Sequence, residues 1–161
     1  MSLIIDGSAG VTFPAGGNPQ AAPAGVIQVV QATFTGNSST TSASMVTTGF
    51  SATIAPKFST SKILILATGN GDNISGGTQI AFSIYRNSTN LSALSFTDIY
   101  GGSSRVIAPF SLNYLDSPAT TSGTVYTLYF ASTSSAGSVT FNQGAGGQPS
   151  VATITLLEIA A

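Results

Sequence analysis

Hydrophobic residues in this chain occur mostly in short runs in which every second position is apolar. In one such run, Ile80, Phe82 and Ile84 alternate with small or polar side chains. A period of two is expected of a β-strand that buries one face, because successive side chains of a strand point to opposite faces. No window has the 3.6-residue period of an amphipathic helix. The pattern therefore predicts an all-β fold.

Segments of this kind recur from Gly25 onward, and each ends at Gly, Pro, Asn or a Ser/Thr cluster. They are expected at residues 26–35, 45–54, 63–67, 79–85, 91–100, 105–115, 125–131, 138–142 and 151–159. About eight short strands divided by turns are typical of an antiparallel two-sheet β-sandwich, jelly-roll-like in strand count.

One of these segments, residues 63–67, is apolar at every position. Continuous apolar strands are typical of sheets covered on both sides, so we expect both faces of this strand to be buried. The residues that follow, Gly69-Asn70-Gly71-Asp72-Asn73, are rich in turn formers and predict a turn.

The beginning of the chain has a different character, because Gly and Pro interrupt every apolar run. This density of Gly and Pro excludes a helix and predicts an extended arm (residues 1–25) before the sandwich domain (residues 26–161). The apolar residues of the arm are too few to form a core, so they need a partner surface. The candidate docking residues are Ile4, Ile5, Val11 and Phe13. A disordered leader is the alternative.

Charged residues are scarce in these 161 residues, at 6% of the sequence with a net charge of −1, against about 25% in ordinary soluble domains. So few charges argue against nucleic acid or an anionic membrane as partner and favour self-association. The surface must consist largely of Ser, Thr, Gly, Asn and Gln, as in secreted and virion proteins. No stretch approaches the ~20 apolar residues of a membrane span, and we expect no signal peptide, since the start lacks a basic region.

The residue inventory also limits the possible chemistry, because the sequence contains neither His nor Cys. The commonest general base, the commonest metal ligands and any disulfide are therefore missing. A catalytic carboxylate pair would have to come from Asp72, Asp98 and Asp116, and a Ser or Thr nucleophile would need Lys57 or Lys62 as its base. Asp72 and Asp116 fall in predicted turns, where Asp is a common turn former. We therefore expect no enzymatic activity and no cofactor.

Metal binding has a single weak candidate, the segment 70–73, whose side chains offer oxygen ligands for Ca²⁺. It lacks the alternating acidic pattern and the bidentate Glu of an EF-hand loop. We therefore expect an ordinary turn and no metal.

The aromatic and cationic residues offer candidates for an interface. The tyrosines are Tyr85, Tyr100, Tyr114, Tyr126 and Tyr129, and they suit either a sugar-stacking or subunit surface or packing between strands. Arg86 and Arg105 are candidates for pairing with Asp98 or Asp116 at a subunit contact, or they are lone surface charges.

A resemblance to a known group of proteins begins in the arm. It is carried by Gly7-Ser8-Ala9-Gly10-Val11-Thr12-Phe13-Pro14-Ala15-Gly16 followed by Gln20-Ala21-Ala22. This run resembles a segment of tail-fibre and other virion proteins of tailed phages, especially those of cyanobacteria and marine bacteria. Their pattern is roughly Gly-x-x-Gly-[Ile/Val]-Thr-Phe-Pro-Asp-Gly-x-x-Gln, from which this chain departs at Ala15 and in its spacing to Gln20. Further resembling pieces lie at residues 26–32, 61–65, 114–121 and 154–159.

The resemblance implies a structural protein of the virion, homotrimeric and without catalysis. The leading hypothesis is a short fibre or decoration subunit, with a tail appendage favoured over the head, whose arm docks onto capsid or tail and baseplate proteins. One alternative is a capsid cement protein that stabilises the shell at three-fold positions. A second is a receptor-recognition module that binds a host surface glycan or protein. A third is a glycosidase or esterase.

Overall fold

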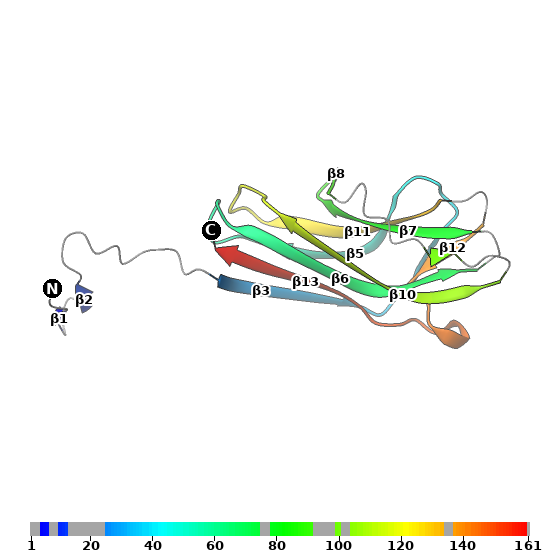
Figure 1. Ribbon diagram of the computed structural model, residues 1–161, viewed down its shortest axis with the longest axis horizontal. Helices are drawn as coiled ribbons and strands as arrows, with labels where there is room; N and C mark the ends of the chain where they lie inside the picture. The colour runs from blue at the N-terminus through cyan, green and yellow to red at the C-terminus, as the bar shows by residue number, and fades with distance from the viewer. Residues whose placement is uncertain are drawn as a thin grey trace.

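A computed structural model of the chain describes residues 4–6, 10–12, 25–74, 78–91, 99–100, 104–133 and 137–160. These residues form strands and one short 3-10 helix, Ala145–Gly147, and no α-helix. The strands of the body lie in two layers packed face to face (Figure 1). The prediction of an all-β, two-sheet antiparallel sandwich is confirmed.

The first layer is a six-stranded antiparallel sheet in the order β3-β13-β6-β12-β4, with β10 also paired to β6. Its strands are β3 (Gly25–Phe34), β4 (Ser38–Thr40), β6 (Lys62–Asn73), β10 (Val106–Asp116), β12 (Val139–Phe141) and β13 (Ala152–Ala160).

The second layer is a five-stranded antiparallel sheet in the order β5-β11-β7-β8, with β9 also paired to β7. Its strands are β5 (Val46–Ile54), β7 (Gln79–Arg86), β8 (Thr89–Asn90), β9 (Ile99–Tyr100) and β11 (Thr124–Ser132).

The strand order is that of a jelly roll. If the short β4, β8 and β12 are set aside, eight strands remain in the body. They pair as β3-β13-β6-β10 in one sheet and as β5-β11-β7-β9 in the other. In chain order these sequences are 1-8-3-6 and 2-7-4-5, the nested Greek keys of a jelly roll. The predicted strand count therefore corresponds to this topology, and most predicted strands agree with the observed ones to within two residues.

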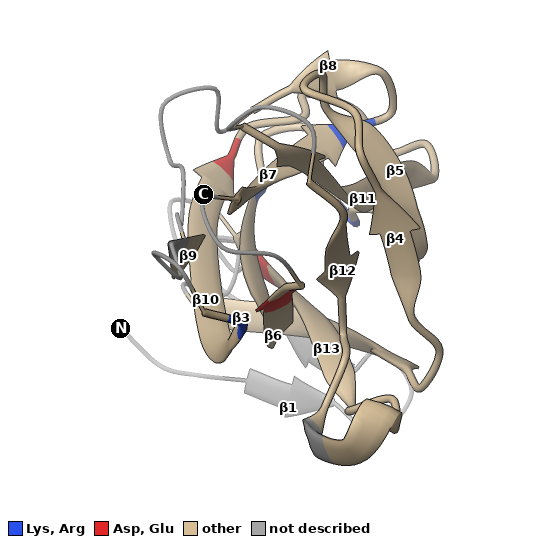
Figure 2. Ribbon diagram, turned by 90° about the vertical axis from the view of Figure 1, so that its right-hand side faces the viewer, with Lys and Arg blue, Asp and Glu red and all other residues tan. Residues whose placement is uncertain are grey.

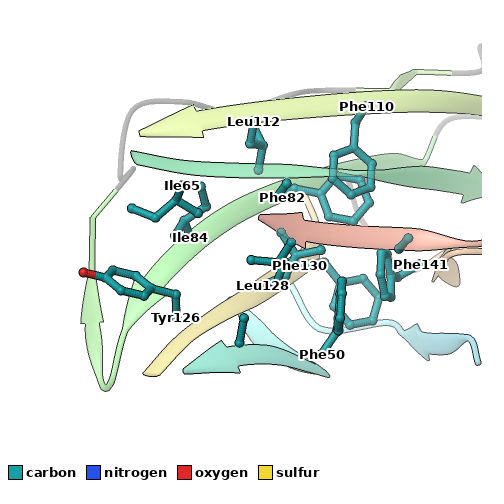
Figure 3. Close-up of a cluster of buried hydrophobic side chains, with 14 of the residues drawn as sticks. Phe50, Ile65, Phe82, Ile84, Phe110, Leu112, Tyr126, Leu128, Phe130 and Phe141 are labelled. Carbon is teal, nitrogen blue, oxygen red and sulfur yellow. The ribbon is translucent and has the colours of Figure 1, made fainter. Parts of the chain in front are cut away.

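The core lies between the sheets and is filled by their inward-facing aliphatic and aromatic side chains. Phe34, Phe50 and Phe141 stack on one another with ring centroids 5.3–6.3 Å apart. Phe82 stacks on Phe110 across the two sheets at 4.0 Å. Figure 3 shows the rings of Phe50, Phe82, Phe110 and Phe141 between the strands of the two sheets.

The predicted turn at residues 69–73 is wrong, because β6 continues through it to Asn73. Gly69 and Gly71 face the core, where a Cβ on Gly69 would lie 3.1 Å from the Phe110 ring. A Cβ on Gly71 would lie 2.8 Å from Ile99 Cδ1 and 3.0 Å from Phe82. The glycines therefore permit close packing of the strand against large core side chains, which is a recognised use of glycine within strands.

The expectation that residues 63–67 are covered on both faces also fails for the single chain. Ile63, Ile65 and Ala67 are buried in the core, whereas Leu66 on the outer face is 39% exposed. A smaller difference is β4, which forms where a Ser/Thr loop was expected and pairs with β12.

Candidate interaction surfaces and charged groups

The arm contains the first candidate surface. Strands β1 (Ile4–Asp6) and β2 (Gly10–Thr12) pair antiparallel with each other, so that Ile5 lies opposite Val11 and Ile4 opposite Thr12. The two strands form a sheet of their own, separate from both sheets of the body. Phe13, the fourth predicted docking residue, lies outside the described residues. Docking by the arm stays a prediction.

Charged residues are sparse along the strands of the sandwich, as the few blue and red segments of the ribbon in Figure 2 show. One group joins the two sheets at the end of the body where β3 begins. Arg86 Nη1 donates to both carboxylate oxygens of Asp116, at 2.9 and 3.0 Å, and Tyr126 Oη donates to Asp116 Oδ2 at 2.7 Å. The Asp116 side chain is 7% exposed and that of Arg86 28%. The arrangement is a hydrogen-bonded clamp between β10, β7 and β11.

The clamp corrects two expectations. Asp116 is the last residue of β10 and a buried ion-pair partner, not a turn former. Its pairing with Arg86 was anticipated, but the pair forms within one chain and not between subunits. Asp98, the other anticipated partner, lies outside the described residues.

The clamp makes a prediction about alkaline unfolding. Burial, and then the hydrogen bond to Asp116, raise the pKa of Tyr126 far above its ordinary value. In the unfolded chain this hydroxyl ionises near pH 10. Its contribution to stability is therefore complete below about pH 10, and above it the free energy of unfolding falls by about 1.4 kcal/mol per pH unit. In urea titrations between pH 8 and 11, Tyr126→Phe should lose this part of the slope. Parallel slopes in the two proteins would contradict the assignment.

A second ion pair lies at the opposite end of β6. Arg105 Nε donates to Asp72 Oδ1 at 2.9 Å and Arg105 Nη2 to Asp72 Oδ2 at 2.6 Å. The Asp72 side chain is fully buried, whereas 45% of the Arg105 side chain is exposed. This hydrogen bond raises the pKa of Arg105. Asp72 is thus a strand residue held by a salt bridge, and its predicted role as a turn former is wrong.

Glu158 is a buried carboxylate that the sequence did not single out. It faces inward from β13 with no exposed surface. The backbone N–H groups of Lys57 and Phe58 donate to Glu158 Oε1 at 2.6 and 3.3 Å. Gln28, with its amide turned to satisfy both ends, donates to Glu158 Oε2 at 2.9 Å. The carboxylate therefore fastens the β5–β6 connection to the last strand, which is a structural role.

The described residues bring together no constellation suited to catalysis. Asp72 and Asp116 are each occupied by an arginine and lie toward opposite ends of β6, since Asp116 pairs with Ile63 and Ile107 pairs with Asp72. Within the part of the chain that is described, no three Asp, Glu, His or Cys side chains gather as a metal site. No helix in that part is long and apolar enough to span a membrane.

The tyrosines whose side chains the structure describes divide between the core and the outer surface. Tyr126 is fully buried, as the packing alternative anticipated. Tyr85 and Tyr129 stack on the outer face of the five-stranded sheet with centroids 3.8 Å apart, and Asn90 Nδ2 donates to Tyr85 Oη at 3.3 Å. Both rings are half-buried, so this pair is the described aromatic surface closest to a sugar-stacking platform.

Comparison with known proteins returned no matching family model and no matching curated protein. Similar solved structures include a chain of the infectious bursal disease virus Gx strain, at 15% identity and TM-score 0.41. They also include the T13 particle of that virus, at 16% and 0.43, and the T=1 particles derived from it, at 16% and 0.44. These matches cover 84%, 83% and 84% of this chain but 39%, 36% and 37% of those chains. The chain thus spans less than two-fifths of their length.

Proposed function

We propose that the chain is a structural subunit of a virion: a short fibre or decoration subunit of a tailed phage that assembles as a homotrimer. The observation that carries the proposal is the separation of the arm from the body. β1 and β2 pair with each other and, among the described residues, with no strand of either sheet. A short apolar hairpin is suited to attachment to another virion protein. The jelly-roll body joined to it is suited to display on the outside of the particle.

The chemistry of the body supports a structural role over an enzymatic one. Three of its buried carboxylates, Asp72, Asp116 and Glu158, hold the fold together through hydrogen bonds. The chain has no histidine to act as a general base. We infer that it is not an enzyme and that its partners are copies of itself and other virion proteins.

The arm would attach by β-augmentation. In this mode a short strand adds to the free edge of a sheet in another protein, where backbone hydrogen bonds supply affinity and side-chain pockets supply specificity. Ile4, Ile5, Val11 and Phe13 are the proposed anchors. The resemblance of the arm to phage fibre proteins favours a tail appendage as the site of attachment.

Deletion of residues 1–24 should leave the body folded and abolish its incorporation into particles. The body keeps both sheets and its core without the arm, so its circular dichroism and its melting temperature should be unchanged within about 2 °C, a shift of less than ~1 kcal/mol for a chain of this size. Incorporation is measured by the amount of the protein in purified particles. A truncated protein that enters particles at the wild-type level would overturn the attachment role.

Cement protein at three-fold positions is the alternative placement. Particles that lack the protein distinguish the two. Loss of adsorption to the host points to an appendage, whereas fragile particles that still adsorb point to cement.

A glycan-binding module is the second candidate, and the stacked Tyr85–Tyr129 pair is the observation that favours it. Sugars bind aromatic faces beside hydrogen-bonding groups, and Asn90 lies next to this pair. A glycan array that compares the intact protein with its Tyr85→Ala variant tests this candidate. The substitution should abolish binding if the Tyr85–Tyr129 pair is the site. Equal glycan binding by the two proteins would exclude this surface as the site.

A further inference from the structure

The outer face of the six-stranded sheet changes from aliphatic to polar along its strands. At the end where β3 begins, one residue from each of four neighbouring strands lies in a single row. The strand registers place Val29 opposite Leu157, Leu157 opposite Leu64, and Leu64 opposite Leu115. Four aliphatic side chains therefore lie side by side across β3, β13, β6 and β10.

The neighbouring rows extend this aliphatic area. On one side, Ile159 lies opposite Val26 and Lys62, and on the other, Leu66 lies between Asn113 and Thr155. We define the aliphatic face as Val26, Val29, Leu64, Leu66, Leu115, Leu157 and Ile159.

The aliphatic face is open to solvent in the single chain. Val29 is 59% exposed, Val26 52% and Leu115 48%. Together with Leu66 these make four of the seven exposed large hydrophobic residues among those described, so exposed apolar surface is concentrated here. Contiguous patches of this kind on a soluble protein mark an interaction site.

The other half of the same face, farther from the start of β3, is polar, and two of its hydroxyl groups hydrogen-bond to each other. Four positions further along the strands the row consists of Thr33, Thr153, Thr68 and Ser111. Thr68 and Thr153 share a hydrogen bond of 2.8 Å between their hydroxyls. Because the other half of the same outer face is polar, exposed aliphatic side chains are not a general property of this face. They are confined to the end of the sheet where β3 begins.

We propose that the aliphatic face is the surface through which copies of this chain contact one another. The inference rests on the proposed homotrimer and deepens it by naming the contact. Three copies that turn this face toward a common axis would bury it and leave the Tyr85–Tyr129 surface of the other sheet outside.

The charge distribution favours a second copy over a foreign partner. Lys62 lies at the margin of the face, and no other charged residue falls in the described rows that form it. Charge complementarity, which selects foreign partners and speeds association with them, is therefore unavailable. A chain with 6% charged residues and a net charge of −1 presents a matching uncharged surface to its own copies.

The position of the arm gives a second argument. β3 begins at Gly25, next to Val26 of the aliphatic face, and β13 ends at the same end of the sandwich (Figure 1). In copies joined through this face, the arms would therefore begin close to one another. Several arms at one point could bind the particle with a high effective concentration.

The dimensions agree with the centre of a protein interface. With strands about 4.8 Å apart and residues about 3.3 Å apart along a strand, the face measures about 14 by 13 Å between Cα positions. With its side chains and a polar rim, such an area fits within the roughly 800 Å² that each partner of a standard interface buries.

The test compares two matched double variants by sedimentation equilibrium or native mass spectrometry. Val29→Lys/Leu115→Lys places two charges on the aliphatic face. Thr33→Lys/Ser111→Lys places the same charges on the same two strands in the polar row. All four positions are exposed in the chain, so both variants should fold, and circular dichroism checks this. Val29→Lys alone serves if the first double variant does not fold.

We expect the wild type and the polar-row variant to have three times the chain mass of 16.1 kDa. The aliphatic-face variant should be a monomer, with association weakened by roughly 30-fold or more for each lysine buried at the centre of the contact. If both variants stay trimeric, or both dissociate, the aliphatic face is not the specific contact, although the homotrimer stands. If the wild type is a monomer at about 100 μM, the inference fails, whereas the virion role is decided separately by particle incorporation. Association of a wild-type monomer only after deletion of residues 1–24 would show that the arm covers the face, which also overturns the inference.

Discussion

Replacement of Phe82 by alanine is expected to lower the free energy of unfolding by about 3–5 kcal/mol, the usual range for a phenylalanine removed from a packed core. The Phe82 side chain has no exposed surface. Its ring stacks on Phe110 of the opposite sheet at 4.0 Å and meets the edge of Phe141 at 6.1 Å. The strand of Gly71 is close against it, because even a Cβ there would approach the ring to 3.0 Å. Its removal therefore leaves a cavity at the contact of the two sheets that rigid neighbours cannot fill.

Urea unfolding followed by circular dichroism measures this loss. Phe58→Ala is the matched control, since Phe58 is 43% exposed and its truncation should cost less than about 1 kcal/mol. A loss for Phe82→Ala no larger than for Phe58→Ala would mean that the sheets do not pack through this ring. Both substitutions should be made in the Val29→Lys/Leu115→Lys protein, the variant proposed above to prevent contact between copies, so that any association between chains does not enter the result.

The strands were predictable because alternation is a local property of the sequence. Ile80, Phe82 and Ile84 are buried as their spacing implies, and the same holds for Leu128 and Phe130 of β11. A strand that buries one face needs only a period of two, which is visible without knowledge of its partners. Strand order, by contrast, depends on contacts between residues far apart in the chain. Only the number of strands pointed toward a jelly roll.

The glycines of β6 show where local signals fail. Gly69 and Gly71, with Asn and Asp between and after them, have the composition of a turn. Their absence of side chains instead makes room for Phe110 and Ile99, which come from distant strands. No residue near these glycines in the sequence indicates the close approach. The local composition therefore predicts a turn at a place where the structure has a strand.

The structural roles of Asp72 and Glu158 could not be predicted for the same reason. The neighbours of Asp72 in the sequence predict a turn, but its partner Arg105 is 33 residues away. The sequence gives no sign that Glu158 is a buried hydrogen-bond acceptor, because its partners, the backbone N–H groups of Lys57 and Phe58, lie about a hundred residues earlier. Backbone donors leave no trace in a sequence, so only the fold reveals that this carboxylate is satisfied.

The aliphatic face was partly visible in the sequence. The continuous apolar run at residues 63–67 indicated a strand covered on both faces, and the structure of the single chain leaves its outer face open. That disagreement is informative, because a pattern suited to double burial remains meaningful if a second copy provides the missing cover. Only the register, however, aligns Val29 and Leu115 with Leu64 across four strands.

Arg86→Met is expected to destabilise the body by about 3 kcal/mol, the lower end of the range for removal of one partner from a buried pair. The lower end applies because 28% of the Arg86 side chain is exposed, so that solvent already screens part of its charge. Methionine keeps much of the apolar stem, so the loss reports mainly on the carboxylate left behind. Asp116, with its side chain 7% exposed, would keep only the hydroxyl of Tyr126 as a partner among the bonds of the clamp.

The double variant Arg86→Met/Asp116→Asn separates this electrostatic cost from lost packing. A neutral amide has no uncompensated charge and still accepts the hydrogen bond from Tyr126, so the second substitution should recover part of the loss, about 1–2 kcal/mol. Asp116→Asn alone should be destabilising, because Arg86 then loses its counter-ion. Recovery in the double variant together with loss in each single one is the signature of a coupled pair in a double-mutant cycle. If the two losses simply add, Arg86 and Asp116 act independently and the clamp between the sheets is not held by their charges.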